Sequence, residues 1–358
     1  MHTNTSVYEH RRQELKKELK TRKLPALLVS HAANRYYLSG FELHDPQCNE
    51  SSGWLVITAD GGDYLFTDAR YIDEARQLWD EKNLCVYAAR KQQEVCAFLK
   101  GKDVTSMGFE PKALHLFDYD KLCEFVTLFP TENVVESLRI IKDKDEIQRM
   151  VQSTNLNHKL FEYIETRLIP GRTEQEISWD VEKFFRENGA EGMAFSTIVG
   201  VGTNAALPHA IPGNTKIREN DMVLIDTGCR LADYNSDQTR TFWVGDTPSD
   251  RFKETMNLVR AAQQAAIDII KPGLSYVQAY RAAYAVFEKA GVETLFTHGL
   301  GHGVGLETHE PPSLSRAAQG ILEAGMVVTV EPGLYDPEWG GIRWEHEVLV
   351  TEDGCRVL

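Results

Sequence analysis

The sequence predicts an α+β protein of two domains, a small N-terminal α/β domain (residues 1–133) and a larger second domain (residues 134–358). Short apolar runs alternate with amphipathic segments over the first third of the chain, as in domains whose helices cover a sheet. The rest of the chain contains two similar helix-forming segments. Its length of 358 residues also favours two domains over one.

The N-terminal domain is expected to contain three strands and four helices. The predicted strands are Ala26–Ser30, Gly53–Ile57 and Tyr64–Thr67. The predicted helices are Val7–Lys20, Tyr71–Trp79, Glu94–Lys100 and Phe117–Leu128. The segment Phe129–Asn133 has the composition of a boundary. A glycine-rich phosphate loop is missing from this region of the sequence, so a nucleotide site has no support there.

The second domain is expected to consist of two related halves with a site between them. A long helical pattern runs from Lys142 to Ile169, and two similar helices follow later in the chain. One begins after Pro170-Gly171 and ends at Gly189, and the other begins after Pro272-Gly273 and ends at Gly291. Thr or Ser near each start is a suitable N-cap, and glycine is a suitable C-terminal stop. Two unrelated helices with ordinary caps would look similar, which is the alternative.

Composition excludes several classes of partner. The formal net charge of −14 and the pI near 5.3 argue against nucleic acid or an anionic membrane as a partner. The first 20 residues are charged throughout, unlike a signal peptide, and we find no run of apolar residues long enough to span a membrane. The six cysteines are scattered without a C-x-x-C pair, which favours reduced thiols and a cytoplasmic location.

Two aspartates mark a predicted hairpin. Met222–Gly228 is an apolar strand that ends with Asp226, and Asn235–Phe242 places Asp237 on what should be the return strand. Either residue alone would pass for a turn or surface charge. Together they place two acids at facing positions of two strands, and chance explains this pair less well than it explains either residue alone.

A glycine-rich segment carries three histidines, His298, His302 and His309, within 12 residues. Glycines beside a histidine let the backbone approach a ligand without Cβ collisions. Further on, two apolar strands carry acids, with Glu331 at the end of one and Glu345 within the other. Such acids must face solvent, pair with a cation or bind a metal. For the four acids considered together, exposure to solvent is the weaker interpretation.

These residues predict a centre of two divalent cations. Four carboxylates and one imidazole suit Mn²⁺, Co²⁺, Fe²⁺ or Zn²⁺ and do not separate these ions; Mn²⁺ is the first expectation. Crowded carboxylates repel one another, and two cations would balance their charge. A water molecule that bridges two such ions can become a hydroxide at neutral pH and attack an amide carbonyl. The remaining histidines and Arg343 would then orient the substrate and stabilise the oxyanion.

At these residues the chain resembles the metallopeptidase family of Xaa-Pro aminopeptidases, prolidases and methionine aminopeptidases. The matching segments are I-D-T-G with D-Q-T-R-T, H-G-L-G-H-G-V-G-L-E-T-H-E, V-E-P-G-L-Y and G-I-R-W-E. The resemblance implies a "pita-bread" catalytic domain behind a smaller N-terminal domain, and a homodimer. It also implies that Asp226 chelates one ion, that His302 and Glu331 hold the other, and that Asp237 and Glu345 bridge them.

The resemblance further assigns catalytic roles. Glu331 would be the acid/base partner of the hydroxide, and His309 would donate to the scissile carbonyl or the tetrahedral intermediate. His209 would line the substrate side, His298 would be a further active-site histidine, and Arg343 would be the arginine that precedes the last ligand. Tyr335 is a lesser candidate. The chain departs from the family at Trp344-Glu345-His346, where Ile-Glu-Asp is usual. His346 would orient Glu345, or Trp344 would reshape a pocket wall, or both would point away from the metals.

The resemblance leaves the substrate open. Release of the N-terminal residue from peptides with proline at the second position is the first expectation, and cleavage of Xaa-Pro dipeptides is the alternative. Dipeptidases often have an arginine soon after the position of His309, whereas Arg316 comes late here. Methionine aminopeptidases generally lack such an N-terminal domain. A metal-free creatinase-like relative or binding protein would have lost ligands, and this chain keeps all five.

Overall fold

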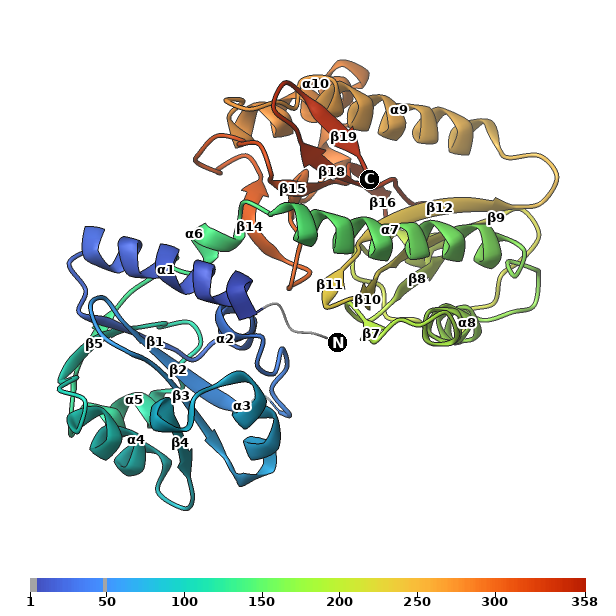
Figure 1. Ribbon diagram of the computed structural model, residues 1–358. Helices are drawn as coiled ribbons and strands as arrows, with labels where there is room; N and C mark the ends of the chain where they lie inside the picture. Colours follow the sequence, from blue (N-terminus) through green and yellow to red (C-terminus); the bar gives the residue numbers. More distant parts are fainter. Residues whose placement is uncertain (1–4, 48–49) are drawn as a thin grey trace. The chain divides into compact units, whose positions relative to one another are not determined.

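The structure, a computed structural model, describes residues 5–47 and 50–358. The chain divides into two compact units, Met1–Arg139 and Ile140–Leu358. The division falls after Arg139 rather than after Asn133, because the short helix α6 (Glu136–Arg139) belongs to the first unit. The guanidinium of Arg139 donates there to Asn34 Oδ1 at 2.7 Å. Each unit is described separately below (Figure 1).

The first unit is built on a six-stranded mixed sheet in the order β4-β3-β2-β1-β5-β6. Its strands are β1 (Ala26–Val29), β2 (Gly53–Thr58), β3 (Asp63–Asp68), β4 (Leu84–Tyr87), β5 (Ser106–Phe109) and β6 (Thr127–Pro130). β2 is antiparallel to both neighbours, and the other pairs are parallel. Side chains from the sheet form a core with α4 and α5 that includes Trp54, Phe66 and Leu99.

The helices of the first unit are α1 (Thr5–Thr21), α2 (Ala32–Ser39), α3 (Ile72–Leu78), α4 (Lys91–Lys100) and α5 (Leu116–Leu122), with the short 3₁₀ turns η1 (Ala69–Tyr71) and η2 (Glu81–Asn83). The four predicted helices of this unit correspond to α1, α3, α4 and the start of α5, whereas α2 was not predicted. The predicted helix 117–128 is wrong beyond Leu122, because Thr127–Pro130 pairs with β5 as an edge strand. Tertiary pairing overrides local helical pattern in this segment.

The second unit begins with two helices that pack on a small sheet. The helices are α7 (Lys144–Glu165) and α8 (Glu174–Glu187). The strands and 3₁₀ turn are β7 (Gly192–Met193), β8 (Ile198–Val201), η3 (Gly202–Ala206), β9 (Asp221–Thr227), β10 (Cys229–Leu231), β11 (Tyr234–Asn235) and β12 (Gln238–Val244). β8, β9 and β12 form one antiparallel sheet, and α7 and α8 cover its outer face with a shared apolar core.

The second half of this unit repeats the plan with its own helix pair. The helices are α9 (Asp250–Ile267) and α10 (Tyr276–Ala290), followed by η4 (Glu293–Leu295). The strands are β13 (Gly301–Gly303), β14 (Glu310–Leu314), β15 (Val327–Val330), β16 (Gly333–Asp336), β17 (Gly340–Arg343), β18 (His346–Val350) and β19 (Cys355–Val357). β14, β13, β15, β18 and β19 form a five-stranded sheet that packs on α9 and α10.

The two halves share a detailed pattern at the start of α8 and α10. Gly171 N–H donates to Ile217 O, and Gly273 N–H donates to Leu322 O, each at 2.8 Å. Both helices start with a capping box, at Thr173 in one half and at Ser275 in the other. This repetition goes beyond ordinary capping and supports the expectation of two related halves.

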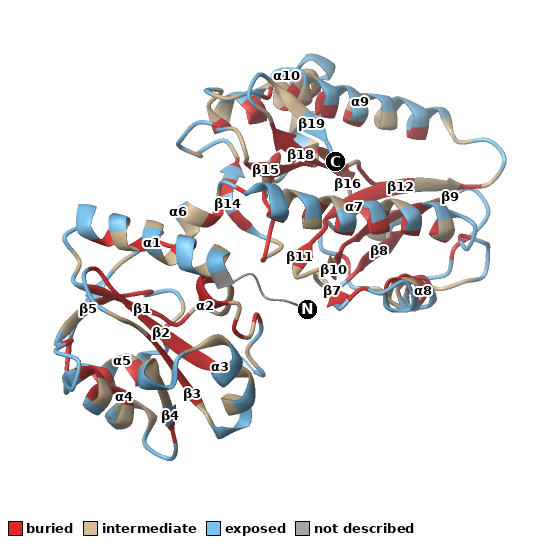
Figure 2. Ribbon diagram, viewed as in Figure 1, coloured by how far each residue is buried: buried red, intermediate tan, exposed pale blue. Residues whose placement is uncertain are grey.

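Burial follows the two layers of each half (Figure 2). Strands β8, β9, β15 and β18 are almost entirely buried, whereas β14, β19 and the outer faces of the helices are partly exposed. Over the described ranges, none of the helices is both long and apolar enough to cross a bilayer. The cysteines at 85, 96, 123, 229 and 355 are free thiols, and Cys48 lies outside the described residues.

Candidate metal centre

The side chains of β9 alternate in direction, and this alternation places the Asp226 side chain towards the interior of the second unit. Side chains along a strand point alternately to its two faces. On β9, Val223 and Ile225 join the apolar core under α7 and α8, whereas Leu224 joins the core under α9 and α10. Asp226 has the same parity as Leu224, so its carboxylate points towards the second half of the unit. Its position at the end of an apolar strand was correctly predicted.

Asp237 stands diagonally opposite Asp226 rather than facing it. In the register of β9 and β12, Asp226 pairs with Thr239, and Asp237 comes two residues earlier, just before β12 begins. Diagonal neighbours share one face of an antiparallel pair. Both carboxylates therefore point to the same side, although the predicted facing arrangement was wrong by two positions.

His302 lies on β13, and the neighbouring strand β15 fixes its backbone. The backbone N–H of His302 donates to Thr329 Oγ1 at 3.0 Å. The flanking glycines serve this packing, because a Cβ at Gly301 would overlap the carbonyl oxygen of Thr329, and one at Gly303 would overlap that of Pro311. The expectation that these glycines clear space for a ligand is therefore corrected, since they clear space for neighbouring strands.

The two glutamates come from the ends of strands. Glu331 directly follows β15, where Val328 and Val330 pack on the helices and the alternate side chain, Thr329, shares the face of Glu331. Thr329 Oγ1 donates to Glu331 Oε1 at 3.2 Å. Glu345 lies in the break between β17 and β18 rather than inside one strand, and its Oε2 accepts from Thr239 Oγ1 at 2.7 Å.

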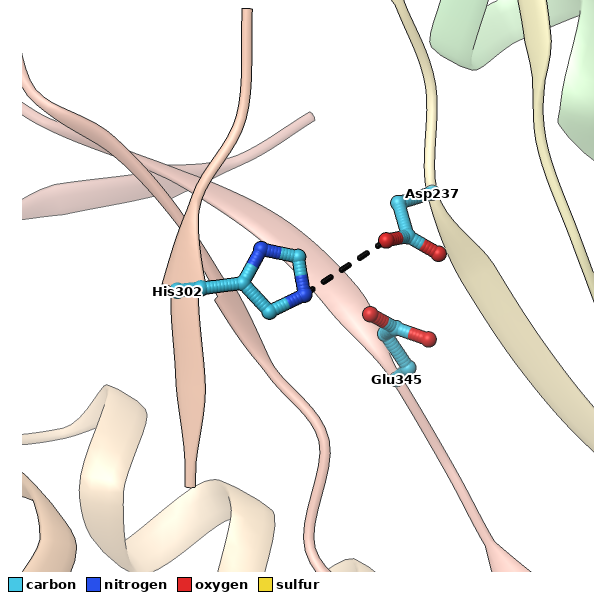
Figure 3. A group of neighbouring side chains, drawn as sticks. All are labelled: Asp237, His302 and Glu345. Atoms are coloured by element: carbon cyan, nitrogen blue, oxygen red, sulfur yellow. Dashed lines mark ion pairs between the residues drawn. The ribbon is translucent and has the colours of Figure 1, made fainter. Parts of the chain in front are cut away.

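These elements bring three potential ligands into one cluster. One donor atom from each of Asp237, His302 and Glu345 lies within 4.8 Å of the other two, a spacing that could hold a metal ion (Figure 3). In Figure 3 the imidazole and the two carboxylates point towards a common centre from three different segments. The Nε2 atom of His302 lies 3.6 Å from Asp237 Oδ2 and 3.3 Å from Glu331 Oε1. Glu331 therefore borders the same cluster.

The electrostatics of the cluster call for cations. Burial raises the pKa of Asp237 well above its usual range, and the neighbouring Glu345, Asp226 and Glu331 raise it further. Burial likewise raises the pKa of Glu345, with further contributions from Glu331 and Asp226. Burial also opposes ionisation of Glu331, but contact with His302 outweighs it and lowers the pKa of Glu331 to about 2. Buried carboxylates this close cannot all ionise without positive charge between them.

Two details of hydrogen bonding fit a bound cation. Asp226 Oδ1 is buried without a hydrogen-bond partner, whereas Oδ2 accepts from Arg343 Nη2 at 2.7 Å. His302 Nδ1 lies 3.0 Å from the carbonyl oxygen of Gly303. A carbonyl only accepts, so Nδ1 carries a hydrogen and Nε2 is the nitrogen that faces the carboxylates. Burial opposes protonation of this ring, but contact with Glu331 outweighs it and raises the pKa of His302, so a bound cation would take the place of the proton on Nε2. A second hydrogen bond that fixes the ring in this way is usual for metal-binding histidines.

Arg343 joins the acids to a histidine network. Its Nη1 donates to the hydroxyl of Tyr335 at 2.7 Å, and its Nε donates to Thr239 Oγ1 at 2.9 Å. The Tyr335 hydroxyl lies 2.9 Å from His298 Nε2, while His298 Nδ1 lies 2.7 Å from the Gly299 carbonyl. His298 therefore carries its hydrogen on Nδ1 and accepts from Tyr335.

A cavity of about 640 Å³ opens in front of these residues, a volume suited to a small ligand. His209 and His309 line it together with apolar side chains. The rings of His309 and His302 are 4.2 Å apart between centroids. Burial lowers the pKa of the His309 imidazole, so that ring is neutral near pH 7. The predicted site residues that line the cavity are His209, Asp226, Asp237, His298, His302, His309, Glu331 and Arg343.

Trp344 and His346, at which the chain departs from the family pattern, have side chains that point away from this cavity. The guanidinium groups of Arg240 and Arg260 lie 4.5 and 5.1 Å from the centroid of the Trp344 ring. His346 Nδ1 contacts Gln263 Oε1 at 3.1 Å. Of the three expectations for these residues, the one in which both side chains turn away from the metals agrees with the structure.

Two residues that support the backbone of the cluster, Glu347 and Thr154, were not predicted from the sequence. Glu347 is fully buried, and its Oε1 accepts from the backbone N–H of Asp237 at 3.0 Å. Thr154 on α7 contacts the other carboxylate oxygen of Glu347. The only available signal was the acid two residues after Glu345 in an apolar strand. Nothing in the sequence connected that acid with α7, because the two are far apart along the chain.

The fold and this site define a metallopeptidase. Residues 148–352 match the model of metallopeptidase family M24, and residues 11–141 match the creatinase/prolidase N-terminal domain. The chain belongs to metallopeptidase family M24. The predicted pita-bread catalytic domain behind a smaller N-terminal domain is thus confirmed, as is the resemblance to the proline-specific branch of the family.

Individual relatives cover nearly the whole chain. An "Xaa-Pro dipeptidase" of Pyrococcus horikoshii is 32% identical over 94% of this chain and 92% of its own. The solved structure of an Xaa-Pro dipeptidase from Bacillus anthracis is 32% identical, with a TM-score of 0.91 over 98% of this chain and 97% of that one. An X-Pro aminopeptidase from Thermotoga maritima is 28% identical, with a TM-score of 0.84 over 95% and 97%. Dipeptidases and an aminopeptidase therefore share this architecture.

Proposed function

We propose that the protein is a divalent-metal-dependent Xaa-Pro dipeptidase, a prolidase. The similarity over almost the whole chain to proteins described as Xaa-Pro dipeptidases carries the substrate part of the proposal. The clustered carboxylates and imidazole carry the metal part. These relatives favour the dipeptidase, the alternative expected from the sequence, over the aminopeptidase that was the first expectation.

We assign two cations to the five predicted ligands. Asp226 would chelate one ion through its unpartnered Oδ1, His302 and Glu331 would hold the other, and Asp237 and Glu345 would bridge the two. When bound, such ions supply Lewis-acid activation of water and of the scissile carbonyl. Mn²⁺ is the first expectation among the ions that suit this donor set, followed by Co²⁺, Fe²⁺ and Zn²⁺.

The chain's own residues would handle the protons and the oxyanion. The oxygen of water bonds to the carbonyl carbon, and Glu331 takes a proton from that water and delivers it to the proline nitrogen as the C–N bond breaks. His309 is neutral near pH 7, so it can donate an N–H to the developing oxyanion. His209 would contact the substrate, and Arg343, through Tyr335, would hold His298 in place.

One observation favours the aminopeptidase as a second candidate. A dipeptide presents a free carboxylate close to the scissile bond, and a cation would recognise it. Among the described residues lining the cavity, Arg343 is the one with a permanent positive charge, and Asp226 and Tyr335 already engage it. A longer peptide has no free carboxylate at this position and therefore needs no cation there. A histidine of the cavity or a second copy of the chain would have to receive the dipeptide carboxylate.

The test compares three substrates that differ only beyond proline. Purified apoprotein is reconstituted with each of the four ions and assayed with Ala-Pro, Ala-Pro-NH₂ and Ala-Pro-Ala. A dipeptidase should prefer Ala-Pro by at least about tenfold in kcat/KM, since the other two lack a carboxylate at the right place. Equal or faster cleavage of Ala-Pro-Ala would overturn the dipeptidase in favour of the aminopeptidase. Ala-Ala serves as the control for proline.

We also infer a cytoplasmic homodimer. The scattered cysteines, of which those described are free thiols, suit a reducing compartment, and the net charge of −14 suits neither nucleic acid nor an anionic membrane. The dimer rests on the family resemblance. Light scattering on the purified protein would test it, with a molar mass of about twice 40.5 kDa as the expected result.

A further inference from the structure

One buried side chain outside the cavity contacts the backbone beside two of the proposed ligands. Gln263 lies on α9 and is 5% exposed. Its Nε2 donates to the carbonyl oxygen of Val330 at 2.8 Å and to that of Trp344 at 3.1 Å. Val330 directly precedes Glu331, and Trp344 directly precedes Glu345. A single carboxamide therefore ties together the two segments that deliver these glutamates.

The three polar contacts of Gln263 together fix the orientation of its carboxamide. Its Oε1 lies 3.1 Å from His346 Nδ1. Because the carbonyls of Val330 and Trp344 can only accept, the NH₂ group must face them and the oxygen must face His346. His346 therefore carries a hydrogen on Nδ1 and donates it to Gln263. The amide thus contacts residues on both sides of Glu345 and uses both of its N–H groups and its oxygen.

Other contacts hold the N–H groups of the two glutamates, since Glu331 N–H donates to Leu300 O at 2.8 Å and Glu345 N–H donates to Thr239 O at 3.2 Å, whereas Gln263 holds the carbonyls just before them. β15 ends at Val330 and β18 begins at His346, and these two residues are the last pair of their ladder. Trp344 and Glu345 lie in the break between β17 and β18. Gln263 bridges the end of the ladder to this break. A buried amide that joins the two strand ends restricts the backbone where two ligands begin.

We infer that Gln263 is a positioning residue for the metal centre, which holds the segments of Glu331 and Glu345 at the separation that the bound cations require. The inference rests on the proposed assignment of these glutamates as ligands. Outer hydrogen-bond partners of this kind orient the groups that bind a metal, and their loss typically costs 10- to 100-fold in affinity or activity. Gln263 touches backbone rather than carboxylate, so it acts by fixing the strand ends.

The test compares Gln263→Met with Gln264→Met. Methionine keeps the approximate size of glutamine without its hydrogen bonds. Gln264 is the next residue on the same helix, is exposed and contacts Asp268 rather than the strands, so its variant is a matched control. Binding of Mn²⁺ is measured by competition with a chelator, and the Co²⁺ absorption spectrum reports ligand geometry. Gln263→Met should weaken at least one ion by about 10-fold or more and alter the spectrum. Gln264→Met should match the wild type in both.

The outcomes separate this inference from the proposed function. A wild-type protein that takes up no divalent cation would overturn both. A wild type that binds cations, together with Gln263→Met of equal affinity and spectrum, would overturn the inference alone. If the methionine variant does not fold, ¹⁵N spectra of the wild type give the tautomer of His346. A hydrogen on Nδ1 is the expected result, and a hydrogen on Nε2 would overturn the proposed orientation of Gln263 and the inference with it.

Discussion

Asp237 and Glu345 contribute two of the three donor atoms that converge in the structure, and both side chains are almost fully buried. We predict that Asp237→Ala and Glu345→Ala each lose at least one cation and nearly all turnover. The loss should exceed the roughly 100-fold that removal of an outer hydrogen-bond partner costs. Metal content by mass spectrometry and kcat/KM check this. Asp250→Ala, at an exposed acid on α9, is the control, and retained activity in either test variant would remove the bridging assignment.

Glu347 should make the stability of the protein depend on pH. Thr154 Oγ1 contacts both Glu347 and the carbonyl of Met150, and one hydroxyl hydrogen cannot serve both. Burial raises the pKa of Glu347 from 4.5 to about 8, so its carboxyl is neutral at pH 7 and can supply a hydrogen. Because the folded pKa lies above the unfolded one, its contribution to stability is complete below about pH 4.5 and is lost as the pH rises to about 8.

Glu347→Gln keeps the shape and removes the charge. Relative to the wild type, its free energy of unfolding should rise as the pH increases across this window, by at least about 1.4 kcal/mol, the equivalent of one pKa unit. Urea unfolding between pH 5 and 9 in the presence of a chelator measures the effect. Glu352→Gln, at an exposed acid beyond β18, should show no such trend. Parallel curves for the wild type and Glu347→Gln would contradict the prediction.

At the level of single residues, the sequence indicated which side chains to collect but not how each is oriented. Asp226 and Glu331 could be placed because apolar strands end at them. The surroundings of Glu345 could not be placed, because the hydroxyl of Thr239, which donates to its carboxylate, and the amide of Gln263, which donates to the carbonyl of Trp344, come from segments more than 80 positions away. Hydrogen-bond networks of this kind arise from tertiary packing, and the hydrophobic period along the chain carries no information about them.

Among the elements, β13 has no room for side chains at its two glycines, because they lie against both neighbouring strands. A Cβ at Gly301 would overlap backbone atoms of Thr329 on β15. We predict that Gly301→Ala destabilises the protein by about 1–3 kcal/mol, as overpacking generally does, and displaces His302. Chemical denaturation and metal affinity measure the two effects. Gly354→Ala is the control, because no atom lies within 4 Å of the added Cβ and the change should stay within about 0.5 kcal/mol.

Elements with strong local signals were predicted well, and those defined by pairing were not. α8 and α10 start within two residues of the predicted caps, because Pro-Gly and a capping box define a helix start locally. β6 was assigned to a helix and boundary region, because its identity depends on pairing with β5. β17 and β18 appeared as one strand, since the break at Glu345 is set by contacts with β12 rather than by a turn residue.

On the scale of the whole molecule, the two units have separate apolar cores, one centred on Trp54 and Phe66 and the others under the two helix pairs. All the proposed ligands belong to the second unit. Residues 134–139 contribute to the first, where Val134 and Val135 are buried. A domain boundary drawn from composition at Asn133 therefore separates these two valines from the unit to which they belong.

This separation predicts how metal should affect unfolding. A ligand stabilises the part of a protein to which it binds, by an amount that grows with its concentration relative to Kd. Mn²⁺ should therefore raise the midpoint of the transition that belongs to Ile140–Leu358 and leave that of Met1–Arg139 unchanged. Calorimetry with and without a chelator shows both transitions, and Trp54 fluorescence, isolated by replacing the other tryptophans, assigns the first. One transition that shifts as a whole would instead mean that the two units unfold cooperatively.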